Sequence, residues 1–239
     1  MASRMTTART VLGVSPSAPD CFRTITDAIA AARDGDVISV QPGTYTESIV
    51  IDRDVTLSGA GGSGEVRVEV SGEPVLRMSA ENAEVWGIEL HHSAGEVAID
   101  LRGGTLRLDE CVVVAESEVA VVARGGTTLR ARGCEVRNPG GAGLLAFDGA
   151  IAELDSCRFT SIATTAVVTR TGGNPKLTGC VVSGAKGGVL AAAGGTGSLD
   201  RCRIEDIAGS AIVVEEGSEL TVAGTEMSGI DGVAVLAAD

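Results

Sequence analysis

Apolar residues recur along most of this chain with a period of 22 or 23 residues, far longer than the period of a helix or a strand. Cysteine marks one position of the repeat five times. This cysteine ladder consists of Cys111, Cys134, Cys157, Cys180 and Cys202. An apolar or small residue lies three positions before each of these cysteines, and another lies two positions after it. A period this regular predicts a chain built from stacked copies of one structural unit.

Each repeat has room for three short strands and three turns. Glycine precedes the cysteine position at Gly87, Gly133, Gly179 and Gly224, which favours a sharp bend with positive φ. Two further alternating columns, which start at Ile99 and Leu101, predict another strand with these side chains inside. The predicted fold is therefore all-β: a right-handed single-stranded parallel β-helix, a three-sided solenoid with 22–23 residues per coil, or rung.

The cysteine ladder predicts buried thiols rather than disulfides or a metal site. Adjacent rungs lie about 4.8 Å apart, whereas the Cβ atoms of a disulfide lie about 3.5–4.5 Å apart. The tight C-x2-C pairs typical of zinc sites do not occur in the sequence. We therefore expect no metal and no cofactor.

The chain divides into an N-terminal arm, residues 1–23, and one β-helix domain, residues 24–239. Residues 24–34 predict a short helix, because Thr24 is a good N-cap and Ile25, Ala28 and Ile29 share one face. This helix would cap the first rung, whose core and strand edges would otherwise be exposed. The last residues continue the repeat without a cap, so we expect either a longer natural polypeptide or end-to-end stacking of two copies.

The net charge of −13 disfavours binding to nucleic acid or to an anionic membrane surface. The N-terminus has no continuous apolar run that would form a signal peptide or a membrane span. Cysteines that are predicted to stay reduced are typical of a cytoplasmic protein. These features predict a cytoplasmic protein.

The segment 24–59 resembles the start of pectin-lyase-like β-helices, including the pectin methylesterase group. The residues that carry the resemblance are Thr24-Ile25, Ala28-Ile29, Gly35-Asp36, Val40, Pro42-Gly43-Thr44-Tyr45, Glu47 and Val55-Thr56-Leu57-Ser58-Gly59. The chain is also similar to actinobacterial proteins in which a β-helix precedes a CbxX-type AAA+ ATPase. That second resemblance implies a sensing, targeting or assembly module rather than an enzyme.

The catalytic motifs that the pectin-active families imply are missing. The only glutamine is Gln41, whereas pectin methylesterases are expected to use downstream glutamines. Polygalacturonases are expected to carry Asp-Asp and Gly-His-Gly, but the chain has no Asp-Asp pair, and Ser93 follows the two histidines, which we expect in an ordinary turn. A calcium-dependent, pectate-lyase-like site at Asp109, Arg132 and Asp155 stays open, although alternating charges on adjacent rungs are also typical of salt-bridge ladders.

An aliphatic column between the two inward columns offers a candidate for partner binding. It follows Asp100, and we expect a column of small residues beside it (Ala98, Ala120, Gly143 and their equivalents) to complete a flat, exposed strip. The predicted partner-binding residues are Val122, Leu145, Phe147, Val168, Leu190, Val213 and Leu236. The main functional hypothesis is a non-catalytic binding or assembly module, part of a larger protein, that docks a protein partner or a second copy. The alternative is a carbohydrate-active, calcium-dependent enzyme.

Overall fold

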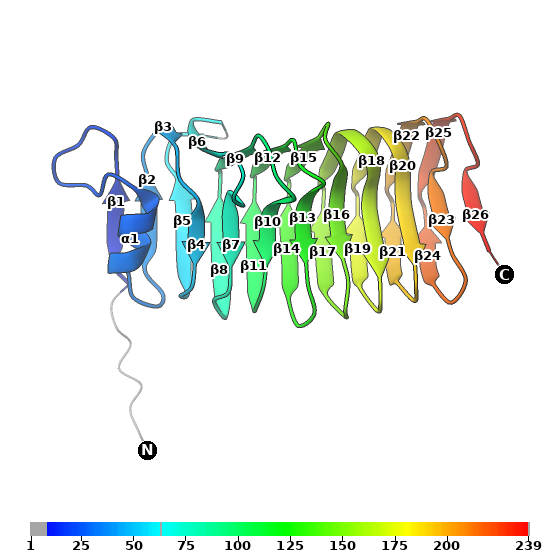
Figure 1. Ribbon diagram of the computed structural model, residues 1–239, viewed down its shortest axis with the longest axis horizontal. Helices are drawn as coiled ribbons and strands as arrows, with labels where there is room; N and C mark the ends of the chain where they lie inside the picture. Colours follow the sequence, from blue (N-terminus) through cyan, green and yellow to red (C-terminus); the bar gives the residue numbers. More distant parts are fainter. Residues whose placement is uncertain (1–8, 63, 239) are drawn as a thin grey trace, which may run out of the picture.

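The computed structural model describes residues 9–62 and 64–238, which form a parallel β-helix of stacked rungs (Figure 1). Each complete rung contributes one strand segment to each of three faces, and equivalent strands of successive rungs pair in parallel. The predicted fold class is confirmed. The register follows the sequence period, because Leu108 pairs with Ala131 and Ala131 with Leu154.

The first face is a ten-stranded sheet. Its strands are β1 (Val11–Val14), β2 (Val37–Val40), β5 (Val55–Gly59), β8 (Asn82–Trp86), β11 (Thr105–Asp109), β14 (Thr128–Arg132), β17 (Ile151–Asp155), β19 (Asn174–Thr178), β21 (Thr196–Asp200) and β24 (Glu219–Ala223).

The second face contains β3 (Gly43–Tyr45), β6 (Val66–Val70), β9 (Glu89–His92), β12 (Val112–Ala115), β15 (Glu135–Asn138), β22 (Arg203–Ile207) and β25 (Glu226–Ile230). The third face contains β4 (Ile49–Ile51), β7 (Leu76–Met78), β10 (Val97–Leu101), β13 (Val119–Ala123), β16 (Ala142–Ala146), β23 (Ile212–Val214) and β26 (Val235–Ala237). Two long strands, β18 (Arg158–Arg170) and β20 (Val181–Ala192), run through both faces and join them into one sheet.

The bend between the first and second faces has a left-handed backbone in every rung where the sequence predicted it. The residues and their φ angles are Gly87 (66°), Glu110 (53°), Gly133 (61°), Ser156 (54°), Gly179 (59°), Arg201 (51°) and Gly224 (57°). A left-handed residue is strained unless it is glycine. The three non-glycine bends therefore cost conformational energy that the packing of the rungs offsets.

The cysteine ladder lies directly after this bend, and its five thiols are free and buried. The strands on either side are in register, since Asp109 pairs with Arg132 and Val112 pairs with Glu135. The Cys134 thiol donates to the carbonyl oxygen of Leu108 on the preceding rung at 3.3 Å. Stacked thiols are therefore part of the core, as predicted.

Helix α1 (Ile25–Ala31) covers the first rung at the N-terminal end of the solenoid (Figure 1). Its Thr24 N-cap accepts a hydrogen bond from the Asp27 amide at 3.0 Å, and both Glu47 carboxylate oxygens accept backbone amides of its first turn at 2.8 Å. The helix ends before the predicted residue 34, because the Asp36 carboxylate accepts the Arg33 amide and holds residues 33–36 in a turn. With seven residues, α1 is too short to cross a membrane, and the described residues form no longer helix.

Candidate functional site

The outer side of the first face carries two columns of mostly charged side chains, which we call the charged columns. Along β11 and its neighbours, inward apolar residues alternate with outward polar ones, so in-register pairing stacks the outward residues. One column reads Glu84, Arg107, Arg130, Glu153 and Lys176; the other reads Trp86, Asp109, Arg132, Asp155 and Thr178.

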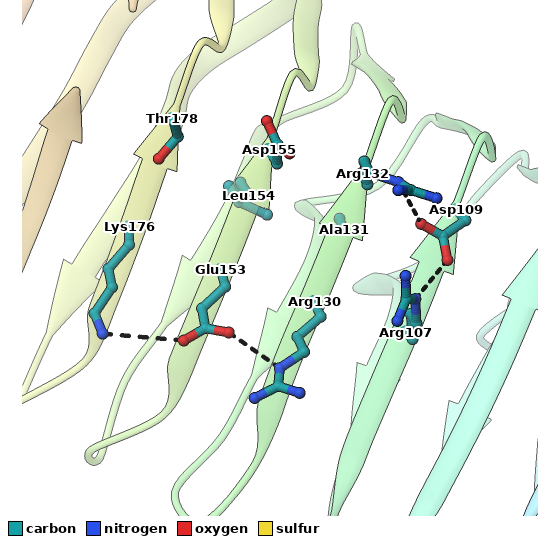
Figure 2. A pocket seen from close by; sticks show the side chains of 10 residues that line it. All are labelled: Arg107, Asp109, Arg130, Ala131, Arg132, Glu153, Leu154, Asp155, Lys176 and Thr178. Carbon is teal, nitrogen blue, oxygen red and sulfur yellow. Dashed lines mark hydrogen bonds and ion pairs between the residues drawn. The ribbon is translucent and has the colours of Figure 1, made fainter. Parts of the chain in front are cut away.

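The charged columns border an open hollow of about 430 Å³ on strands β11, β14, β17 and β19 (Figure 2). The three residues of the predicted lyase-like site, Asp109, Arg132 and Asp155, all line it. Four basic and three acidic side chains surround the hollow. These side chains give the lining a net charge of +1 (4 − 3), on a protein whose net charge is −13.

Asp109 organises the end of the hollow that lies nearer to the N-terminus. Its side chain is only 4% exposed and accepts the Arg107 Nε at 2.6 Å and the Arg132 Nε at 3.1 Å, one on each carboxylate oxygen (Figure 2). The hydrogen bond to Asp109 raises the pKa of Arg107, so this guanidinium is a fixed cation and not a proton acceptor. Both guanidinium groups keep their outer nitrogens available for an anion.

Glu153 organises the other end of the hollow. It accepts the Arg130 Nε at 3.0 Å and lies 4.0 Å from the Lys176 Nζ. Arg130 and Lys176 are exposed and Glu153 is partly exposed, so each pair contributes little to stability. Their main effect is to hold Arg130 and Lys176 over the face, where Arg130 lies on the same strand as Arg132.

A second hollow of about 410 Å³ continues the first toward the N-terminus and shares Arg107 and Arg130 with it. Trp86 lines neither hollow but lies beside them, because β8 and β11 pair Trp86 with Asp109. The Trp86 side chain is a large aromatic surface with 39% exposure. An exposed aromatic ring beside fixed guanidinium groups is typical of a binding surface.

Calcium does not fit this arrangement. Both Asp109 oxygens, which a calcium ion would need, already accept hydrogen bonds from arginines. Within 9–62 and 64–238, no cluster of three or more His, Cys, Asp or Glu side chains is placed to hold a metal ion. The calcium-dependent part of the alternative hypothesis therefore lacks a ligand set in this hollow.

The predicted partner-binding residues lie on the outer side of the third face, but they are less exposed than expected. Val122 and Val168 are only 3% and 8% exposed. Leu145, Phe147, Leu190 and Val213 are partly buried, and Leu236 is exposed. Neighbouring rungs and the arginines beside Val122 shield the middle of the column, so the predicted flat, open strip is wrong in this respect.

The column of small residues does not flank the strip at all. A Cβ atom placed on Gly143 would lie 2.8 Å from the ring of the buried Phe159, so this position faces the core. The pairing of β10 with β13 skips this position between Val97 and Ile99, which disturbs the simple alternation. The histidines were also misplaced, because His91 and His92 lie in strand β9 and not in a turn.

Sequence reasoning missed Arg107, Arg130 and Lys176, although a signal for them was present. Arg107, Arg130, Glu153 and Lys176 recur every 23 residues, four positions before the cysteine ladder. Trp86 occupies the same column as Asp109, in a rung where Ile88 replaces the cysteine. Following each outward column through rungs without cysteine would have found the whole site.

The stacked parallel rungs define the class of protein, a parallel β-helix, and comparison with known proteins defines the family. The model of the family described as the right-handed β-helix region matches residues 118–239. This match spans half of the chain, so the chain belongs to that family. No curated protein sequence matches the chain significantly.

Solved structures share the fold. The alginate lyase from Paenibacillus sp. str. FPU-7 has a TM-score of 0.63 at 14% identity, over 95% of this chain and 100% of that one. The carrot pectin methylesterase also has a TM-score of 0.63, at 12% identity, over 100% of this chain and 90% of that one. The Aspergillus niger pectin methylesterase has a TM-score of 0.57 at 16% identity, covering 97% and 88% of the two chains. The likeness is one of pectin-lyase-like fold, and similarity to AAA+-associated β-helices stays a prediction.

Proposed function

We propose that this protein is a carbohydrate-active β-helix that binds an acidic polysaccharide along the outer side of its first face. The observation that carries the proposal is the group of arginines, Arg107, Arg130 and Arg132, around one open hollow. Guanidinium groups bind carboxylates through paired hydrogen bonds. Two of the three are anchored by Asp109, which keeps them in place before a ligand arrives.

The dimensions of the site suit an extended sugar chain. Strands β8, β11, β14, β17 and β19 are successive neighbours, so the site measures roughly 19 Å along the solenoid axis. The spacing between adjacent rungs is close to the length of one sugar unit. A sugar chain along the axis would therefore meet a new pair of outward side chains at every unit. Trp86 offers a flat apolar surface for a sugar ring at one end.

The structural neighbours point to the same class of ligand. Alginate and pectin, which appear in the names of these neighbours, are both polymers of uronic acids. Because the likeness in sequence is low, this supports the proposal only through the shared fold. The three arginines around the hollow are the independent support.

Cleavage by β-elimination is the second candidate function, and the position of Asp155 favours it. Asp155 pairs in register with Arg132, and its carboxylate accepts the Ser156 hydroxyl at 2.9 Å but forms no ion pair among residues 9–62 and 64–238. With a uronate carboxylate on Arg132, Asp155 would take the proton from the carbon next to it. A carbon–carbon double bond would form while the glycosidic carbon–oxygen bond breaks, and the leaving oxygen would take up a proton.

Binding is testable by the fluorescence of Trp86, the only tryptophan of the chain. We expect oligomers of alginate or polygalacturonate to change its emission, and neutral cello-oligomers to have little effect. The variants Arg130→Glu and Arg132→Glu should abolish the response, whereas Arg170→Glu, at an exposed position on another face, should keep it. Equal responses to neutral and acidic oligomers, or no response to either, would refute the proposal.

Cleavage has its own readout, the ultraviolet absorbance of the unsaturated uronate product. If the protein is a lyase, this absorbance rises with wild-type protein, and Asp155→Asn stops the rise while the Trp86 response to the oligomer remains. Binding without any rise in absorbance would restrict the function to recognition.

A further inference from the structure

On the outer side of the third face, one column begins with Val50, Arg77 and Asp100 and is aliphatic in every later rung. In six successive rungs the position is Val122, Leu145, Val168, Leu190, Val213 and Leu236, and in the rung before them it is Asp100. The Asp100 side chain is only 3% exposed. Because six rungs pack with an aliphatic side chain at this position, stacking does not require a carboxylate here. The contacts that Asp100 makes must therefore account for its presence.

Those contacts are two arginines. The Arg102 Nε donates to one carboxylate oxygen of Asp100 at 2.7 Å, and the Arg124 Nε donates to the other at 2.9 Å. Burial raises the pKa of Asp100, but the two hydrogen bonds outweigh it and lower the pKa below its ordinary value. Asp100 thus stays ionised and holds both guanidinium groups, while the Arg102 and Arg124 side chains remain 52% and 42% exposed.

The arginines form a row beside the aliphatic column, which together we call the arginine–aliphatic surface. Continuing the register of the third face, the row reads Arg102, Arg124, Phe147 and Arg170. The Arg124 guanidinium carbon lies 5.7 Å from the centre of the Phe147 ring, a distance at which a cation and an aromatic face attract. Arg170 is exposed. Fixed cations and aliphatic side chains therefore lie next to one another.

We propose that the arginine–aliphatic surface docks an extended segment of a partner polypeptide that carries acidic side chains next to aliphatic ones. Charge complementarity selects this partner, because each guanidinium can pair with a carboxylate of the segment. The aliphatic column selects a polypeptide over a sugar chain, whose hydroxyl groups would lose hydrogen bonds against it. This surface is separate from the charged columns of the first face.

The test uses a defined probe, a fluorescein-labelled 12-residue peptide of alternating Glu and Leu, and measures its anisotropy with the full chain. We expect saturable binding that weakens with added salt. Arg170→Glu and Leu190→Glu should each weaken binding about tenfold or more. These two positions are chosen because Arg170 is exposed and Leu190 points outward, so neither substitution empties the core.

Two matched controls define the outcome. Arg130→Glu, a charge reversal on the first face, should bind the peptide as the wild type does. A peptide of alternating Lys and Leu should not bind. The proposal is overturned if the Lys peptide binds as well as the Glu peptide, or if Arg170→Glu and Leu190→Glu, shown to be folded by circular dichroism, bind normally. It is also overturned if an acidic oligosaccharide, and not the peptide, loses binding in the Arg170→Glu variant.

Discussion

The left-handed bend of each rung allows a stability prediction that depends on backbone conformation and involves no steric clash. Gly133 has φ of 61°, and a Cβ atom at this position would lie 3.8 Å from its nearest neighbour, the Glu110 Cγ. That distance is an ordinary contact, so Gly133→Ala introduces no clash. A left-handed residue with a side chain costs about 1–2 kcal/mol. The lower entropy of the unfolded chain offsets part of this, so Gly133→Ala should destabilise the protein by about 0.5–1 kcal/mol.

Two further variants separate this cost from a general effect of replacing glycine. Gly62→Ala is the control, because its φ is not left-handed and no atom lies within 4 Å of the added Cβ. It should be neutral or should stabilise by a few tenths of a kcal/mol. Ser156→Gly is the reverse change, at φ of 54°. It relieves the strain but increases the entropy of the unfolded chain, so we expect a net gain of about 0.5–1 kcal/mol.

Thermal and urea unfolding, followed by circular dichroism, measure the three variants. For a domain of this size each kcal/mol shifts Tm by about 2–4 °C, so Gly133→Ala should lower Tm by about 1–4 °C. The dependence of the unfolding free energy on urea should not change, because the substitution leaves the buried surface intact. If Gly133→Ala and Gly62→Ala unfold at the same midpoint, the reasoning about the bend is wrong.

Two other predictions concern the thiols and the buried imidazole. Because the cysteine ladder is buried and Cys21 is partly exposed, a thiol reagent should label Cys21 alone in the native protein and all six cysteines after denaturation. Rapid labelling of Cys134 in the native protein would contradict its burial. Burial lowers the pKa of His92 below 6.5, so the unfolded chain binds this proton more readily, and the stability present above pH 6.5 is lost as the pH falls through the folded pKa. The urea midpoint should therefore drop between about pH 7 and pH 5, and His92→Ala should flatten that drop; an unchanged pH slope in the variant would exclude His92 as its source.

The sequence was sufficient to predict the solenoid because the period repeats the same three inward positions in every rung. The bend confirms this most directly, since Glu110, Ser156 and Arg201 adopt the left-handed backbone although none is glycine. Their place in the repeat, not their own preference, determines their conformation. A neighbour that stacks in register imposes its backbone path on the next rung.

The outer surfaces were harder to predict because simple alternation fails where a strand is irregular. In the third face, Ala98 and Ile99 are adjacent and both fully buried, so counting every second residue assigned the small column to the wrong side. Burial of Val122 was also unforeseen, because alternation gives the direction of a side chain but not the size of its neighbours. The pairing of Asp100 with Arg102 and Arg124 depends on such neighbours, so it could be found only in the structure.

Asp100 and Asp109 share one arrangement, and it explains how an acidic protein can present two cationic surfaces. Each side chain is almost completely buried, and each accepts the Nε of an arginine two residues away along the chain and of another from the next rung. Burying a carboxylate costs several kcal/mol unless such partners compensate, so each carboxylate is held together with its two arginines. The result is a rigid pair of cations with free outer nitrogens. The two pairs differ in their surroundings. Trp86 and polar side chains border the arginines of Asp109, whereas aliphatic side chains border the arginines of Asp100. For this reason we assign a sugar chain to the first face and a polypeptide to the third.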